Sequence, residues 1–268
     1  MKRLTTTLAC VLLYSVTLGA QQPASSKWEI TDNSFLVEES FNQEPRIFQN
    51  IFTWTRERRG QWSASFTQEW PAPDKQHQLS FTIPFSGSDS ASGINDLLVN
   101  YRYQLLDEGP GRPALSPRLS VVLPSGSTSK GLGLGAYGLQ FNVPASKQFG
   151  DLYVHANAGG TWRPRVETDT TRRRVNLWSP HVAGSVIWRA TPMLNLMLES
   201  ILEFEQSVDV DGETPRERTV TISPGFRRGW NRGDTQIVVG VGVPVSRASG
   251  ETTAALLTYF SLEMPFKK

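Results

Sequence analysis

After residue 45, apolar side chains recur at every second position in one segment after another. In a β-strand, this period of two places every member of the series on one face of the sheet. The segments run for roughly nine residues or more, which exceeds most strands of soluble proteins and suits a tilted bilayer crossing. One such series is Leu194, Leu196, Leu198, Leu202 and Phe204, with Asn195, Glu199, Glu203 and Glu205 between them. The chain is therefore predicted to be all-β.

Turn-forming residues divide the alternating region into about twelve segments. The predicted strands are 46–57, 61–70, 77–86, 94–106, 114–124, 134–144, 150–163, 180–190, 193–206, 217–229, 233–245 and 252–266. An even number suits a single-chain bacterial barrel, in which long outer loops alternate with short inner turns. The expected outer loops are 86–93, 125–133, 164–180, 207–215 and 246–251, and the expected inner turns include 144–149, 190–192 and 231–233.

A sheet that lies in a lipid bilayer must close on itself. Lipid offers no partner to a bare backbone group, so a sheet within a bilayer must have no edge. We therefore expect residues 46–268 to form a transmembrane antiparallel up-and-down β-barrel of about 12 strands. A soluble β-sandwich would bury the same alternating faces, but the strand length and the signs of export favour the barrel. An interfacial aromatic girdle is predicted from Trp54, Trp62, Trp70, Trp162, Trp178, Trp188 and Trp230.

The first twenty residues predict export. Lys2 and Arg3 precede an apolar run at 8–18, and Leu18-Gly19-Ala20 offers a cleavage site of small residues. Residues 1–20 are thus expected to be a signal peptide, which would carry away Cys10, the one cysteine of the chain. The mature chain would then have no disulfide and no thiolate metal site. Residues 21–45 are expected to form an N-terminal periplasmic segment that could fold inward as a partial plug.

The polar faces of the predicted strands indicate what would line the barrel. The candidate pore-lining residues are Asp96, Asn100, Arg102, Arg118, Glu199, Glu203 and Glu205. A water-filled pore needs such a lining, and its charges set ion selectivity. The alternative is that opposed charges pair and fill a narrow barrel, since twelve strands lie between the filled eight-stranded barrels and the open porins.

Other motifs argue against common chemistries. His77, His155 and His181 lie in or beside different strands without the spacing of metal ligands, and no cofactor is predicted. A Ser-His-acid hydrolase in the barrel wall is conceivable, but no Gly-x-Ser-x-Gly elbow occurs. The 27 basic and 25 acidic residues become 25 of each without Lys2 and Arg3, so no nucleic acid is expected as a partner.

A basic run in a loop and an aromatic residue near the C-terminus suggest two binding partners. The run 172–174 makes the longest outer loop basic, which would attract lipopolysaccharide or an anionic solute; a simple solvated loop is the alternative. Outer-membrane barrels commonly end at an aromatic residue that the barrel assembly machinery reads, and Phe266 is the candidate for this signal. Lys267 and Lys268 follow it here and weaken the match.

Several short motifs, taken together, match the pattern of a known protein family. They are FNQE at 41–44, Gln49, QEWP at 68–71, HQL at 77–79, TIP at 82–84, GIND at 93–96, NYRY at 100–103, Pro117-Arg118, LPSG at 123–126 and LEMPF at 262–266. The chain resembles, over most of its mature length, the transporter-like outer-membrane family named after the meta-cleavage pathway of phenol degradation. This resemblance implies an outer-membrane barrel that acts as a channel or uptake protein, with aromatic substrates suggested by the family name, and it carries no catalytic residues.

These observations lead to one expected function with two alternatives. We expect a non-enzymatic outer-membrane channel or uptake barrel for small solutes, hydrophobic or aromatic compounds among them. Its surroundings would be outer-membrane lipid and lipopolysaccharide. The alternatives are a barrel-borne enzyme that acts on lipid and a structural barrel without an open pore.

Overall fold

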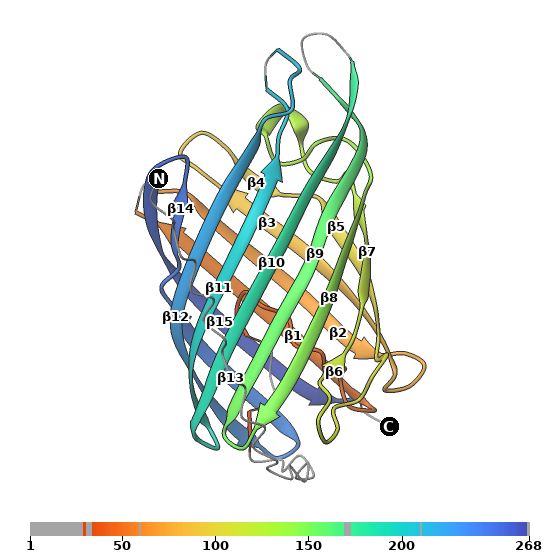
Figure 1. The fold of residues 1–268 in the computed structure, drawn as a ribbon, viewed down its shortest axis with the longest axis vertical. Helices are drawn as coiled ribbons and strands as arrows, with labels where there is room; N and C mark the ends of the chain where they lie inside the picture. The colour runs from red at the N-terminus through yellow and green to blue at the C-terminus, as the bar shows by residue number, and fades with distance from the viewer. Residues whose placement is uncertain (1–28, 31–33, 59, 169–172, 210, 267–268) are drawn as a thin grey trace, which may run out of the picture.

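A computed structural model describes residues 29–30, 34–58, 60–168, 173–209 and 211–266. These residues form one antiparallel sheet in which the first strand pairs with the last, so the sheet closes into a barrel (Figure 1). The predicted signal peptide at 1–20 lies outside the described residues. In the described part of the chain, no helix is long and apolar enough to cross a membrane.

The barrel has twelve strands, three of which are interrupted. Because β4 extends β5 along β3, β6 extends β7 along β8, and β14 extends β13 between β12 and β15, fifteen segments make twelve strands. The segments are β1 Ile47–Glu57, β2 Trp62–Pro71, β3 His77–Gly87, β4 Ser92–Ile94, β5 Leu97–Tyr103, β6 Ala114–Leu115, β7 Arg118–Leu123, β8 Gly138–Phe149, β9 Leu152–Glu167, β10 Arg174–Thr191, β11 Leu194–Gln206, β12 Arg216–Arg232, β13 Thr235–Gly242, β14 Val245–Ala248 and β15 Glu251–Pro265, with one short 3-10 helix, η1 Thr128–Lys130. The predicted fold class and strand number are confirmed.

The outer face of the barrel is apolar. The alternating residues of the predicted series point outward, as Leu196, Leu198, Val239 and Phe260 show with exposed fractions of 41–52%. Their neighbours Asn195 and Glu199 are almost fully buried on the inner side. A cation facing lipid at the bilayer midplane costs about 2–4 kcal/mol, which is why the charged residues of these strands lie on the inner face.

Several strand ends differ from the prediction. β9 and β10 extend to Glu167 and from Arg174, so most of the predicted 164–180 loop is a paired hairpin. Strands that extend beyond the membrane into water need no apolar alternation, so the sequence pattern did not predict this extension. β14 likewise occupies part of the predicted 246–251 loop, which leaves only a turn at 249–250.

The predicted inner turn at 144–149 is also wrong, because β8 runs through Pro144 to Phe149. Pro144 lies opposite the break between β6 and β7, where its carbonyl accepts a hydrogen bond from the amide of Ser116 at 3.2 Å. A proline lacks only the amide hydrogen and is tolerated where a ladder is interrupted. The actual turn between β8 and β9 is Gly150-Asp151, with Gly150 at a φ of 61° that favours glycine.

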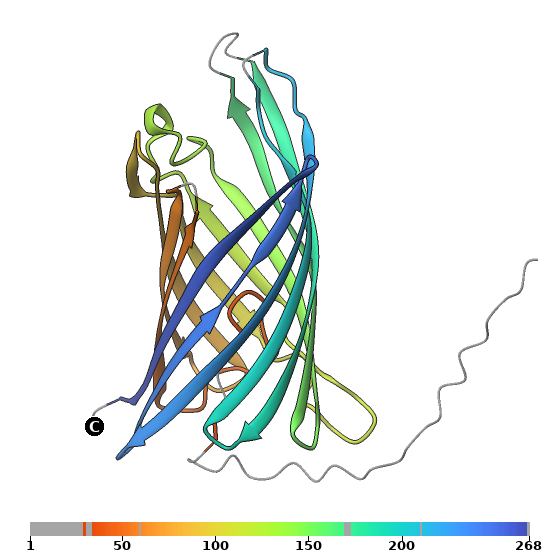
Figure 2. The same ribbon diagram turned by 90° about the vertical axis from the view of Figure 1, so that its left-hand side faces the viewer.

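Both ends of the barrel wall lie at the same end of the molecule. The amide of Phe266 donates to the carbonyl of Arg46 at 2.7 Å, and the Phe266 ring lies 5.4 Å from that of Phe48. The long loops extend from the opposite end (Figures 1 and 2). The role of Phe266 as an assembly signal stays a prediction.

Candidate functional site

The inner face of the barrel is polar and partly filled by the chain itself. Residues 34–45, which we call the lumen segment, precede β1 and fold back inside the wall, where Figure 2 shows them as a loop within the barrel. Ser34, Val37 and Ser40 are at most 4% exposed although they belong to no strand. Before the segment, Ile30 donates its amide to the carbonyl of Pro192 at 3.1 Å, in the turn between β10 and β11. The lumen segment thus enters from the end that carries the short turns.

A row of inner-face side chains holds the lumen segment. Strand register places Ser146, His155, Ser185 and Glu199 opposite one another across β8 to β11; we call them the polar row. Glu199 Oε1 accepts the amides of Leu36 and Val37 at 2.7 and 3.1 Å. A carboxylate that accepts backbone amides satisfies donors that would otherwise be buried without partners.

The other members of the polar row act in the same way. The hydroxyls of Ser34 and Ser185 are 2.8 Å apart, and the Ser40 amide donates to Ser146 Oγ at 2.8 Å. Ser146 Oγ is also 2.7 Å from His155 Nδ1. Only Glu199 of this row was among the predicted lining residues, because serines and a histidine on an inner face carry no sequence signal without the strand register.

Arg102 anchors the second half of the lumen segment. Its guanidinium donates to Asn42 Oδ1 and to the carbonyls of Glu39 and Phe41, each at 3.0 Å, and Glu69 lies at 4.0 Å. The side chain is 4% exposed. A buried guanidinium needs such a set of acceptors, because desolvating an unpaired charge is expensive.

Arg118 pairs with the lumen segment through Glu38. Arg118 Nε lies 2.9 and 3.0 Å from the two Glu38 carboxylate oxygens. Burial by itself would raise the pKa of the Glu38 carboxyl, but the charge and hydrogen bonds of Arg118 outweigh it and hold the pKa below its ordinary value of 4.5. Asn157 fixes the backbone on both sides of this residue, since it accepts the Glu38 amide and donates to the Glu38 carbonyl.

The lumen segment also has an apolar anchor. The Phe35 ring lies 5.0 Å from that of Tyr259 and belongs to a buried cluster with Ile51 and Leu257. Gly240 provides the space, because a Cβ at that position would lie 2.3 Å from Phe35 Cζ. The glycine therefore allows the ring to lie directly on the wall.

The remaining predicted lining residues have different roles. Asp96 forms an ion pair with Arg163 at 2.6 Å and accepts the amide of Gly126 at 3.0 Å, so it fixes the outer loop 124–137. Asn100 donates to Ser80 at 3.1 Å and so joins the wall strands. Glu203 and Glu205 line an open cavity, and neither forms an ion pair with another described residue.

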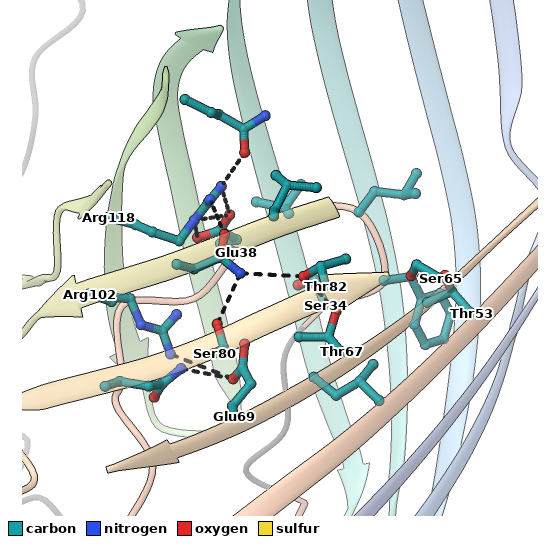
Figure 3. A pocket seen from close by; sticks show the side chains of 18 of the residues that line it. Ser34, Glu38, Thr53, Ser65, Thr67, Glu69, Ser80, Thr82, Arg102 and Arg118 are labelled. Atoms are coloured by element: carbon teal, nitrogen blue, oxygen red, sulfur yellow. Dashed lines mark hydrogen bonds and ion pairs between the residues drawn. The ribbon is translucent and has the colours of Figure 1, made fainter. Parts of the chain in front are cut away.

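Two cavities lie beside the lumen segment. The larger, about 1000 Å³, opens toward the long loops, and we call it the outer vestibule; it includes Glu203 and Glu205 in its lining. The smaller, about 260 Å³, lies between the lumen segment and β1–β5, among the hydroxyls of Thr53, Ser65, Thr67, Ser80 and Thr82. Figure 3 shows this inner cavity with the Arg118–Glu38 and Arg102–Glu69 pairs on one side. Both cavities are lined by Leu36, Glu38, Leu98, Arg118 and Gln140, so they meet at the Arg118–Glu38 pair.

The hydrolase alternative finds only a fragment of a site. Ser146 and His155 are hydrogen-bonded, but they are 1% and 2% exposed beneath the lumen segment. A nucleophile must be reachable by its substrate, and a lipid cannot reach this pair while Ser40 covers it. His77 bonds instead to the Tyr101 hydroxyl at 2.6 Å, in a different part of the wall.

Comparisons with known proteins agree with this architecture. An outer-membrane channel from Pseudomonas putida F1 superimposes with a TM-score of 0.62 at 12% identity, covering 84% of this chain and 98% of that one. The NanC porin gives a TM-score of 0.51 at 9% identity, covering 82% of this chain and all of the other. No curated protein matches by sequence. These likenesses show that the chain has the fold of the barrels found in outer membranes.

A family model supplies the relationship that the sequence motifs suggested. The model described as "putative MetA-pathway of phenol degradation" matches residues 29–257, which include both the lumen segment from its first residue and nearly the whole barrel wall. The chain therefore belongs to the family described as "putative MetA-pathway of phenol degradation".

Proposed function

We propose that this protein is a channel for small solutes in which the lumen segment forms a movable constriction. The observation that carries the proposal is the meeting of the two cavities at the Arg118–Glu38 pair. A solute that enters the outer vestibule reaches the inner cavity by passing Leu36 and Glu38, and a shift of the lumen segment widens this path. The barrel wall needs no rearrangement, because its closing pair β1–β15 does not include the segment.

The lining supports solutes of mixed character. The inner cavity offers hydroxyl groups together with the apolar side chains of Phe35, Ile51 and Tyr259. Binding sites of this kind combine apolar surface with a few polar groups that orient the ligand. Small compounds with an aromatic or apolar body and one polar group fit this description, in keeping with the family name.

A reversible cross-link tests whether the segment must move. Cysteines at Ser34 and Ser185, whose hydroxyls are 2.8 Å apart, can form a disulfide that locks the lumen segment to β10. Cys10 is replaced by serine. We expect discrete conductance steps in planar bilayers under reducing conditions and a severalfold lower conductance after oxidation.

The matched control joins two wall strands instead. Thr221 and Ser246 lie opposite each other on β12 and β14 with hydroxyls 2.8 Å apart, so the T221C/S246C disulfide should leave conductance unchanged. Full conductance through a completely oxidised S34C/S185C barrel would refute the movable constriction. Absence of any steps, with uptake of no small solute into liposomes, would refute the channel itself.

A further inference from the structure

Three arginines gather on the outer face of the barrel near the long-loop end. Arg216 and Arg218 belong to β12, and Arg247 belongs to β14. Register pairs Arg247 with Val220, which places Arg247 diagonally beside Arg218 on the same face. All three side chains are exposed. They form a positively charged corner, which we call the arginine corner, next to the apolar outward-facing residues of β12.

The arginine corner has no counter-charge on its own face. The residues opposite Arg216, Arg218 and Arg247 on the adjoining strands β11 and β15 are Gln206, Phe204 and Thr252, all uncharged. The alternation of the strands turns Glu217 to the inner side, where Ser249 donates to it at 2.6 Å. Within the described ranges, neither Arg218 nor Arg247 takes part in an ion pair. The corner therefore presents unneutralised positive charge.

The height of the arginine corner matches a membrane surface. Along the outer face of β12, the next cation is Arg228, ten residues away, whose guanidinium lies 5.7 Å from the centre of the Trp230 ring. At about 3.3 Å per residue and a strand tilt of about 40°, ten residues span about 25 Å, the height of the apolar band of such barrels. Only Val220, Ile222, Pro224 and Phe226 face outward between them. Arg218 and Arg228 thus mark the two edges of the hydrocarbon layer.

We propose that the arginine corner binds the phosphate groups of lipid A, the lipopolysaccharide anchor of the outer leaflet. Arg218 and Arg247 face that leaflet at the level of its head groups, and arginine binds phosphate through paired N–H donors. The acyl chains lie against Val220, Ile222 and Val245, which are 37–50% exposed just below. This assignment rests on the outer wall and is independent of the channel proposal. It also differs from the basic run at 172–174, which extends into the start of β10 at Arg174 and lies partly outside the described residues.

Native mass spectrometry of the full barrel with purified lipid A tests the site. An arginine near an anionic lipid surface contributes about five- to sixfold, so R218Q/R247Q should weaken lipid A binding about 30-fold. R228Q, on the same strand at the opposite edge, is the matched control and should leave lipid A binding within about twofold of the unaltered protein. Dephosphorylated lipid A should bind the unaltered barrel about as weakly as lipid A binds the double variant.

Three results would overturn the assignment. They are undiminished binding to R218Q/R247Q, an equal loss in R228Q, and equal affinity for lipid A and its dephosphorylated form. The last comparison changes only the lipid, so it decides the matter even where the variant fails to fold. Competition by phosphatidylglycerol at equal concentration would likewise refute it, because the arginine corner would then bind any anionic lipid and not lipid A specifically.

Discussion

The guanidinium of Arg102 makes three hydrogen bonds to the lumen segment, and its removal should release residues 39–42. The change Arg102→Gln keeps a polar side chain on the inner face of β5 but cannot reach the three acceptors that the guanidinium joins. Because strand pairing of β5 with β3 and β7 does not use this side chain, the barrel should still form.

The magnitude follows from the contacts. A hydrogen bond from a charged donor contributes about 1.5–3 kcal/mol, and Arg102 makes three to the segment, each at 3.0 Å. The bonds share one side chain and are not additive, and water can reach the freed acceptors, so we take about 3 kcal/mol. At 1.4 kcal/mol per factor of ten, the undocked population should rise roughly a hundredfold.

Thiol labelling measures this population. Ser40 is fully buried, so a cysteine introduced there, with Cys10 replaced, reacts with a maleimide only when the segment undocks. We expect labelling of S40C/R102Q to be roughly a hundredfold faster than that of S40C. The control is Arg163→Gln, which removes an inner-face arginine paired with Asp96 in the wall rather than with the segment. Equal labelling rates for S40C and S40C/R102Q, with the barrel folded, would refute the anchoring role.

Two further predictions concern charge. Replacing Glu203 and Glu205 by glutamine removes unpaired carboxylates from the outer vestibule, so the reversal potential in a salt gradient should shift toward lower cation selectivity; an unchanged potential would contradict this role. Burial opposes ionisation of the Glu38 carboxyl, but Arg118 lowers the pKa of this group overall. The ionised carboxylate therefore stabilises the docked segment above pH 4.5. This stabilisation is lost as the pH falls through the lowered pKa. Conductance should thus stay constant from pH 8 to about 5 and rise only in stronger acid. The Glu38→Gln variant should show the raised conductance already at neutral pH. A conductance transition centred near neutral pH would contradict this role of the Arg118–Glu38 pair.

The barrel could be predicted from the sequence because lipid imposes a simple rule on each strand. The series from Leu194 to Phe204 is apolar at every second position except Ser200, because the outward positions of the wall meet hydrocarbon. Outward positions need not be apolar where the strands extend beyond the membrane. The β9–β10 hairpin continues to Glu167 and from Arg174, where its strands no longer alternate apolar and polar residues, so the sequence predicted a loop there.

The site was harder to predict, because it depends on which strands are neighbours at the same height. Arg102 and Arg118 were identified as inward-facing, but their partners Asn42 and Glu38 come from a segment without periodic structure. Ser185 and Glu199 meet through strand register, which a one-residue slip would abolish. The inward position of a residue can be read from alternation, whereas its partner across the lumen cannot.

The polar character of this interface bears directly on how the segment could move. Most of its attachments join wall side chains to backbone amides or carbonyls of the segment, as Glu199 does for Leu36 and Val37. Water can replace such bonds at a net loss of about 1 kcal/mol for a neutral pair and about 1.5–3 kcal/mol where one partner is charged, whereas an extensive apolar interface would lose its full burial energy. Phe35, in the space above Gly240, is the exception, because its release exposes apolar surface. A segment attached mainly by hydrogen bonds can exchange them for water one at a time, while the barrel wall around it stays closed.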